Sequence, residues 1–206
     1  MSDSAVTSMT IKTWGGRDVN IATTQARQLL QAKVLKGLVK HMGRAQGLVP
    51  DLISAPTMAK DLNIESSFST ELPNGAGRDS PYWNLVTVTV KRADNSTCTM
   101  TGAVFGETPH ILQVDEFTDL FAFKPEGGNI LTFRNLDRPG AISEVLELLH
   151  SANINVASVN VARASKDPAE RRALCFMDLD EQIPSNILKS LKSSTTLSQV
   201  ANIVLR

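Results

Sequence analysis

Hydrophobic residues in the second half of the chain form short apolar runs separated by one helical stripe. Residues 130–133 are an apolar run that predicts a strand. Residues 140–150 carry apolar side chains at the spacing of one helix face, and the members of this stripe are Ile142, Val145, Leu146, Leu148 and Leu149. Asn153 follows at a position where it can end the helix in a left-handed conformation.

Two further strand-like runs come next. Residues 155–162 are rich in Val and small side chains, and residues 173–179 are apolar. Pro184 predicts the start of a short helix, and residues 197–205 alternate as a closing strand. The order strand, helix, strand, strand, helix, strand is the split βαβ, ferredoxin-like plan. We therefore predict a βαββαβ domain over residues 129–206.

The first half of the chain predicts a second α+β domain over residues 7–124, dominated by antiparallel strands. A helix is expected from Thr23 or Thr24 to about Met42, with Lys33, Lys36 and Lys40 on its solvated side. A shorter helix is expected over residues 57–63. Strands or extended pieces are expected at residues 9–14, 19–21, 48–56, 64–71, 85–90, 97–105, 110–114 and 117–123, with a turn at 15–16 and loops at 73–77 and 124–128.

The junction after residues 130–133 carries the most suggestive chemistry. Pro139 suits the first position of a helix, where its missing N–H would have no partner. Asp137 stands just before it, where a carboxylate can accept from free helix amides and offset the helix dipole. Amides and one carboxylate at a helix start suit a small zwitterion, whose carboxylate and ammonium each find a partner. The same residue types also fit a plain helix start.

Composition restricts the class of protein. The 206 residues include 42% hydrophobic and 20% charged residues with a formal net charge of zero, as in globular soluble proteins. This balance gives no basic surplus for nucleic acid or anionic membranes, and no run reaches membrane-spanning length. The N-terminus shows no leader pattern, so we expect an intracellular, cytoplasmic protein, with an organelle as an alternative.

Cysteine and histidine usage predicts no metal site. Cys98 and Cys175 lie far apart, each within an apolar strand pattern, which favours buried free thiols in a reducing compartment over a disulfide or a metal site. The three histidines, His41, His110 and His150, show no ligand spacing.

Residues 129–206 resemble an ACT domain. The resemblance depends on the turn Asp137-Arg-Pro-Gly140 and on the stretch Ala152-Asn-Ile-Asn-Val156 after the helix, at the right spacing within this order of elements. ACT domains are regulatory modules that bind amino acids. They also pair, so the resemblance implies a homo-oligomer with residues 155–162 and the turn at Asp137 near the interface.

The first half is similar to the allosteric substrate-binding domain of long-form D-3-phosphoglycerate dehydrogenases, which lies between the catalytic region and a C-terminal ACT domain. The similar pieces are Ala32-Lys-Val-Leu-Lys-Gly37, Ile53-Ser-Ala-Pro-Thr-Met-Ala-Lys60, Asn84-Leu-Val-Thr-Val88, Gly102-Ala-Val-Phe-Gly106 and Phe121-Ala-Phe-Lys-Pro125. The combined resemblance covers about residues 8–206.

The resemblance implies two ligand sites. In the ACT domain, L-serine would be bound by Asn135, Asp137 and Asn155, with Asp137 on the ammonium and Asn155 contributed by the facing subunit. Backbone amides in the turn Arg138–Ala141 would add donors, and the predicted effector set is completed by Arg138, Pro139, Gly140 and Ala141, of which Pro139 has no N–H to donate. Asn135 stands where relatives often carry His or an aromatic residue. In the first domain, His110 and Lys124 match positions that hold a phosphorylated metabolite or another anion, although a packed histidine and a solvated lysine are the alternative.

The chain lacks the parts that dehydrogenase chemistry needs. A dinucleotide-binding unit requires a strand, a G-x-G-x-x-G turn and a helix, and the glycines of Asn74-Gly-Ala-Gly77 lie in a polar loop instead. We assign no catalytic residue, no metal ligand and no cofactor to this chain, and NAD would belong to a parent enzyme. Three hypotheses follow: the regulatory region of such a dehydrogenase, a stand-alone amino-acid-binding or assembly module acting on a separate enzyme, and an enzyme in its own right.

Overall fold

The computed structural model describes residues 4–15, 23–43, 47, 49–71, 84–117, 122–125, 128–164 and 171–205. Within these ranges the chain divides into two compact units, Ser2–Val104 and Phe105–Arg206. Both units are α+β with mainly antiparallel sheets, which confirms the predicted fold class. The expected turn at 15–16, the short extended piece at 19–21 and the loop at 73–77 lie wholly or partly outside the described residues.

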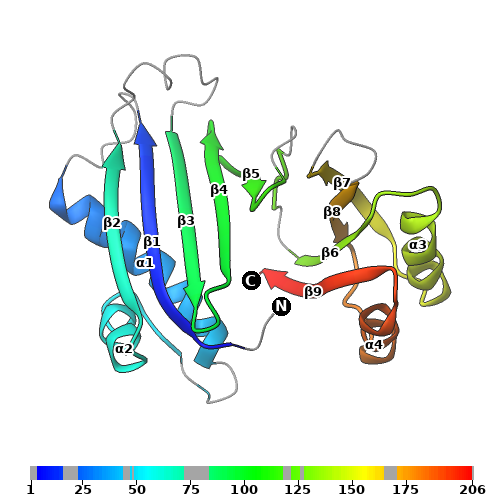
Figure 1. The fold of residues 1–206 in the computed structure, drawn as a ribbon, viewed down its shortest axis with the longest axis horizontal. Helices are drawn as coiled ribbons and strands as arrows, with labels where there is room; N and C mark the ends of the chain where they lie inside the picture. Colours follow the sequence, from blue (N-terminus) through cyan, green and yellow to red (C-terminus); the bar gives the residue numbers. More distant parts are fainter. Residues whose placement is uncertain are drawn as a thin grey trace. The chain divides into compact units, whose positions relative to one another are not determined.

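The first unit is a sheet with two helices packed on one face (Figure 1). Its elements are β1 (Val6–Gly15), α1 (Thr24–Met42), α2 (Ala55–Asp61), β2 (Glu65–Glu71), β3 (Asn84–Arg92) and β4 (Thr97–Phe105). The sheet has strand order β2-β1-β3-β4-β5. Its last strand, β5 (Thr108–Val114), belongs to the second compact unit. β1 and β2 run parallel, whereas β1–β3 and β3–β4 are antiparallel.

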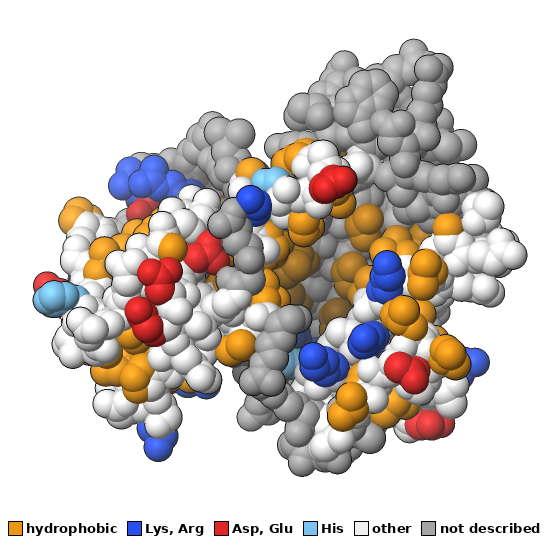
Figure 2. Space-filling model, turned by 180° about the vertical axis from the view of Figure 1, so that it is seen from behind, with side chains coloured by type: hydrophobic (Ala, Val, Ile, Leu, Met, Phe, Trp, Pro, Cys, Tyr) orange, Lys and Arg blue, Asp and Glu red, His pale blue; other side chains and the backbone are white. Residues whose placement is uncertain are grey.

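Helix α1 begins and ends where the sequence predicts. The Thr23 hydroxyl accepts a hydrogen bond from the Ala26 amide at 3.2 Å, which caps the first turn. The buried face of the helix presents Leu35 and Val39 to Met9 and Ile11 of β1. Its three predicted solvent-side lysines are all exposed. The space-filling view from behind shows basic side chains interspersed with hydrophobic ones on this surface (Figure 2).

Helix α2 starts two residues earlier than predicted. Asp51 accepts hydrogen bonds from the amides of Ile53 and Ser54 at 2.8 and 2.6 Å, so the chain turns at once into a helix at Ala55. Pro56 then lies in the first helical turn, where a missing N–H has no cost. These hydrogen bonds also lower the pKa of the Asp51 carboxyl below its usual value.

The second unit contains the ferredoxin-like order predicted for residues 129–206. Its elements are β6 (Gly128–Leu136), α3 (Ala141–Ser151), β7 (Val156–Arg163), β8 (Arg172–Leu179), α4 (Ser185–Ser193) and β9 (Leu197–Leu205). The strand order is β7-β8-β6-β9, so the first strand of the motif lies centrally and β7 forms one edge. The β6–β8, β6–β9 and β7–β8 pairs are antiparallel.

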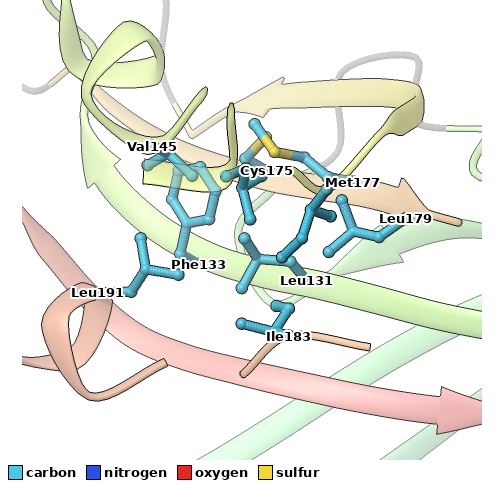
Figure 3. Close-up of a cluster of buried hydrophobic side chains, with 10 residues drawn as sticks. Leu131, Phe133, Val145, Cys175, Met177, Leu179, Ile183 and Leu191 are labelled. Atoms are coloured by element: carbon cyan, nitrogen blue, oxygen red, sulfur yellow. The ribbon is translucent and has the colours of Figure 1, made fainter. Parts of the chain in front are cut away.

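Both helices of this unit pack on the same face of the sheet (Figure 3). Phe133 and Leu131 from β6 meet Val145 from α3 and Leu191 from α4, and all four side chains are buried. Asn153 has φ 56°, so the predicted left-handed end of the first helix is confirmed. This layer of apolar contacts fixes the start of α3 relative to the end of β6.

The other face of the same sheet explains where the compact units divide. Phe117 and Phe123 are buried against Ile130 and Phe176, and the rings of Phe123 and Phe176 have centroids 5.0 Å apart. Residues 105–117 therefore belong by packing to the second unit, whereas the sequence placed the boundary at residues 124–128. The strand expected over 117–123 is reduced to isolated bridges at Phe117 and Phe123, and residues 118–121 lie outside the described part of the chain.

Candidate functional site

The turn between β6 and α3, residues 137–140, is tighter than the sequence indicates, and we refer to it as the helix-start turn. Helix α3 begins at Ala141, with Gly140 as its N-cap at φ 87°. Pro139 therefore precedes the helix and does not occupy its first position, which corrects the sequence prediction. Few side chains tolerate this positive φ, so glycine at 140 allows the chain to reverse between strand and helix.

Backbone hydrogen bonds hold this turn from within. The Arg138 amide donates to the Leu136 carbonyl at 2.9 Å, and the Ala141 amide donates to the Arg138 carbonyl at 3.3 Å. Both amides were expected to serve as ligand donors, and both already have partners in the turn. A ligand can share these donors only in bifurcated hydrogen bonds or through a rearrangement of the turn.

The Asp137 carboxylate is paired with a cation that the sequence did not suggest. Its Oδ2 atom lies 2.6 Å from Nε of Arg163, at the end of β7. The predicted contact with helix amides is wrong, because α3 has no side-chain cap. The Arg163 contact is close but lacks hydrogen-bond alignment, so Oδ2 is buried without an aligned donor among the described residues. A ligand ammonium that binds Oδ2 would therefore have to displace the Arg163 side chain from it.

Asn135 lies beneath the helix-start turn and is 6% exposed. Its Nδ2 donates to the Leu136 carbonyl at 2.8 Å, while Oδ1 is buried without a partner within the described ranges. The residue also lines a pocket with a volume of about 300 Å³. The other lining residues are Arg134, Leu136, Arg172, Thr195, Thr196, Leu197, Ser198 and Gln199.

Asn155 lies at the opposite end of the sheet from the helix-start turn. It directly precedes β7, whose first residue Val156 pairs with Leu179, whereas Arg163 at the other end pairs with Ala173. The Asn155 side-chain amide donates to Asp180 at 2.6 Å, and its backbone amide donates to Glu181 at 2.9 Å. A single chain therefore does not bring Asn155 to Asp137, and the origin of Asn155 in a facing subunit stays a prediction.

The two residues predicted to hold an anion lie next to each other. An antiparallel bridge joins Ile111 to Phe123, and this register sets His110 opposite Lys124. The His110 ring packs against Phe105 with the ring centroids 4.6 Å apart and the planes tilted by 43°, and its Nδ1 lies 3.1 Å from the Thr108 carbonyl oxygen. One face of the His110 ring therefore packs against an aromatic side chain, as in the predicted alternative of a packed histidine.

Several charged residues that contact Asp137 or Asn155 were not found by sequence analysis. Arg163, Asp180 and Glu181 reach Asp137 and Asn155 from distant parts of the chain, and no local motif marks them. Arg138 pairs with Glu144 at 3.3 Å on the exposed surface of α3. Arg163 is thus the cation that directly contacts the Asp137 carboxylate.

The described residues contain no group of three or more His, Cys, Asp or Glu side chains placed to hold a metal ion. Within those same ranges, no helix combines the length and apolar character needed to cross a membrane. Cys175 is buried, as predicted, whereas Cys98 is only half-buried, which corrects the prediction for that residue.

Comparison with known proteins identifies the second unit. Residues 129–194 match the family model for the ACT domain. The chain is 32% identical over 178 residues to D-3-phosphoglycerate dehydrogenase from Methanocaldococcus jannaschii, which covers 85% of this chain and 30% of that protein. It is 22% identical over 151 residues to D-3-phosphoglycerate dehydrogenase from Mycobacterium leprae, covering 72% of this chain and 26% of the relative. The chain thus spans less than a third of the length of the curated relatives it matches.

Proposed function

Residues 129–194 form an ACT domain, and from this premise we propose that the chain is the regulatory region of a D-3-phosphoglycerate dehydrogenase. In this proposal paired ACT domains bind L-serine and hold the chains together as a homo-oligomer. The similarity to dehydrogenases of that name from an archaeon and a mycobacterium supports the choice of enzyme. NAD and the oxidoreductase chemistry would then belong to a catalytic domain that acts in cis or in trans.

One geometric observation carries the serine site. Asp137 and Arg163 lie at one end of the β7 edge strand, and Asn155 lies at the other end. Two β7 strands related by a twofold axis and paired antiparallel would set the start of one against the end of the other. Asn155 of one chain would then face Asp137 of its partner, twice in each pair.

The exposed edge of β7 supports this mode of pairing. Val159 and Val161 are 43% and 41% exposed, and β7 forms a free edge of the sheet within the described residues. Exposed apolar side chains on an unpaired edge favour association with another strand. Pairing would bury both residues and satisfy the edge amides and carbonyls.

The chemistry of the paired site suits an α-amino acid. Asp137 offers a carboxylate acceptor for the ammonium, and the Oδ1 atom of Asn155 can accept from the hydroxyl. A well-placed charge-assisted hydrogen bond contributes roughly 1.5–3 kcal/mol net. Ordering of the ligand and of the turn opposes this gain, so we expect micromolar to millimolar affinity.

Titration calorimetry tests the proposal directly. The chain should release or absorb heat with L-serine and show weaker binding of glycine, which lacks the hydroxyl, and of D-serine, which places it differently. Light scattering at about 100 μM should show a dimer or larger species. The absence of both heat and a thermal shift at about 10 mM L-serine would refute the effector assignment.

A stand-alone amino-acid-binding module that acts on a separate enzyme is the alternative. The coding sequence upstream of Met1 distinguishes the two, because a reading frame that continues into a G-x-G-x-x-G unit would place the dehydrogenase in the same polypeptide. Turnover of 3-phosphoglycerate with NAD by the purified chain would instead favour an enzyme in its own right.

The proposal includes an anion site at His110 and Lys124. Their cross-strand placement supports a shared phosphate-like ligand, with Lys124 supplying the charge. Titration of 3-phosphoglycerate into wild type and Lys124→Ala, with Lys192→Ala as an exposed control, tests this site, and Lys124→Ala alone should bind more weakly.

A further inference from the structure

The ion pair between Asp137 and Arg163 has a consequence for which ligands the ACT domain accepts. Asp137 is 20% exposed at its side chain and Arg163 is 61% exposed, so a carboxylate set into the surface faces a guanidinium that reaches solvent. The contact with Asp137 is made by Nε of Arg163. The terminal nitrogens carry additional N–H donors in a planar fork that matches a carboxylate.

We infer that Arg163 is the residue that selects for a ligand carboxylate, so that the helix-start turn binds zwitterionic α-amino acids and discriminates against simple amines. This inference rests on the proposed function. Asp137 and Arg163 present a negative and a positive group side by side, and an α-amino acid presents the opposite two groups at a similar spacing. Each group of the ligand therefore meets its complement.

Arg163 is the cation whose side chain contacts the Asp137 carboxylate. The carboxylates on which the proposed site draws are Asp137 from one chain and Asp180 and Glu181 beside Asn155 from the other. An amino acid that entered among these groups without a cation would suffer repulsion of its own carboxylate. Arg138 is already paired with Glu144, and Arg134 with Asp115 and Glu116.

The same pair makes amine binding unfavourable. An amine that approaches Asp137 meets the positive charge of Arg163 at hydrogen-bond distance and must compete with it for Oδ2. A zwitterion compensates for that competition, because its carboxylate takes up the guanidinium as its ammonium takes up Asp137. Discrimination by such opposed charges is a difference between two affinities, and it depends on the repulsive contact as much as on the attractive one.

The test compares L-serine with ethanolamine, which keeps the amine and the hydroxyl but lacks the carboxylate. Wild type should bind L-serine at least about tenfold more tightly than ethanolamine. Arg163→Gln should reduce that preference about tenfold, and Arg163→Lys, which keeps the charge without the fork, should reduce it less. Arg27→Gln is the control, because Arg27 is an exposed arginine on α1 and lies outside the ACT domain.

Each outcome decides the inference. If a folded Arg163→Gln protein loses affinity for L-serine and ethanolamine equally, Arg163 has only a structural role. If its preference for L-serine is unchanged, Arg163 takes no part in recognition. Either result overturns the inference and leaves the proposed function intact. If wild type binds neither compound, the proposed function fails and the inference falls with it. L-Serine methyl ester, which lacks the free carboxylate, provides the same comparison on wild type without a substitution. If the ester binds as tightly as L-serine, the inference is also overturned.

Discussion

Asp137 and Asn155 lie at opposite ends of one sheet, beyond the last residue of β6 and before the first residue of β7. The strand register separates these two ends by roughly 20 Å, from a rise of about 3.3 Å per residue. One chain therefore cannot place both side chains on a small ligand. Under the proposed function, every serine site needs two chains.

Mixing two inactive variants should restore binding. Asp137→Ala and Asn155→Ala chains should each lose the tight serine site, because every site in either homodimer lacks one partner. Chains unfolded and refolded together should form mixed dimers, each with one intact site. The mixture should then contain about a quarter of the serine sites of the same amount of wild type. Calorimetry on the mixture measures this number, and a mixture that binds no better than its components would contradict the two-chain site.

Removal of the Asp137 carboxylate should weaken serine binding by about 2 kcal/mol, roughly thirtyfold in affinity. Asp137→Asn should cost less, because the amide keeps the shape and one acceptor. Asp61→Ala, an exposed acid on α2, serves as the control and should bind like wild type. Wild-type affinity in the Asp137→Ala protein would place the site elsewhere.

Two glycines should respond in opposite directions to alanine. Gly140 has φ 87° and open space where the methyl group of an alanine would lie, so Gly140→Ala should destabilise the second unit by about 1 kcal/mol through backbone strain alone. Gly37 lies within α1, also with open space, so Gly37→Ala should stabilise the first unit by about 0.5–1 kcal/mol. Urea unfolding followed by hydrogen exchange in each unit measures both changes, and equal signs would contradict the backbone argument.

Arg134 should contribute more to stability than Arg138. The Arg134 guanidinium forms ion pairs with Asp115 and Glu116 and lies 5.0 Å from the Phe117 ring, with a side chain only 18% exposed. Arg134→Ala should cost about 1–3 kcal/mol of unfolding free energy, since it leaves a partly buried carboxylate without its cation. Arg138→Ala breaks an exposed pair and should cost less than about 0.5 kcal/mol. Chemical denaturation of both variants checks the order.

Cys175 should make the fold less stable in alkali. Burial raises the pKa of its thiol from 9.0 to about 12, because the apolar surroundings disfavour the thiolate. The unfolded chain releases this proton at lower pH than the folded chain, so the contribution is fully present below pH 9 and declines as pH rises toward 12. The test compares the Cys98→Ser protein with the Cys98→Ser, Cys175→Ala protein. From about pH 8 to about pH 10.5, the urea midpoint should decrease more in the protein that keeps Cys175. Equal declines would show that this thiol is not the cause.

The sequence by itself determined the elements of the second unit and their order. The apolar stripe of α3 and the left-handed Asn153 are local patterns, and each is set by residues a few positions apart. The strand β9 was also predicted, although Ile203 and Leu205 of its expected apolar alternation are exposed. Periodicity and turn chemistry report such short-range structure well, because the side chains that specify it are neighbours in the chain. The match of residues 129–194 to the ACT family confirms this part of the interpretation.

Only the tertiary structure decided which groups meet at the candidate site. Arg163 reaches Asp137 because β7 and β6 both flank β8, and no local pattern encodes a contact between residues from strands that do not pair with each other. The boundary of the second unit likewise depends on Phe117 and Phe123, which pack against a sheet formed mostly by later residues. Ion pairs and apolar packing act through space, so their partners emerge only when the sheet is assembled.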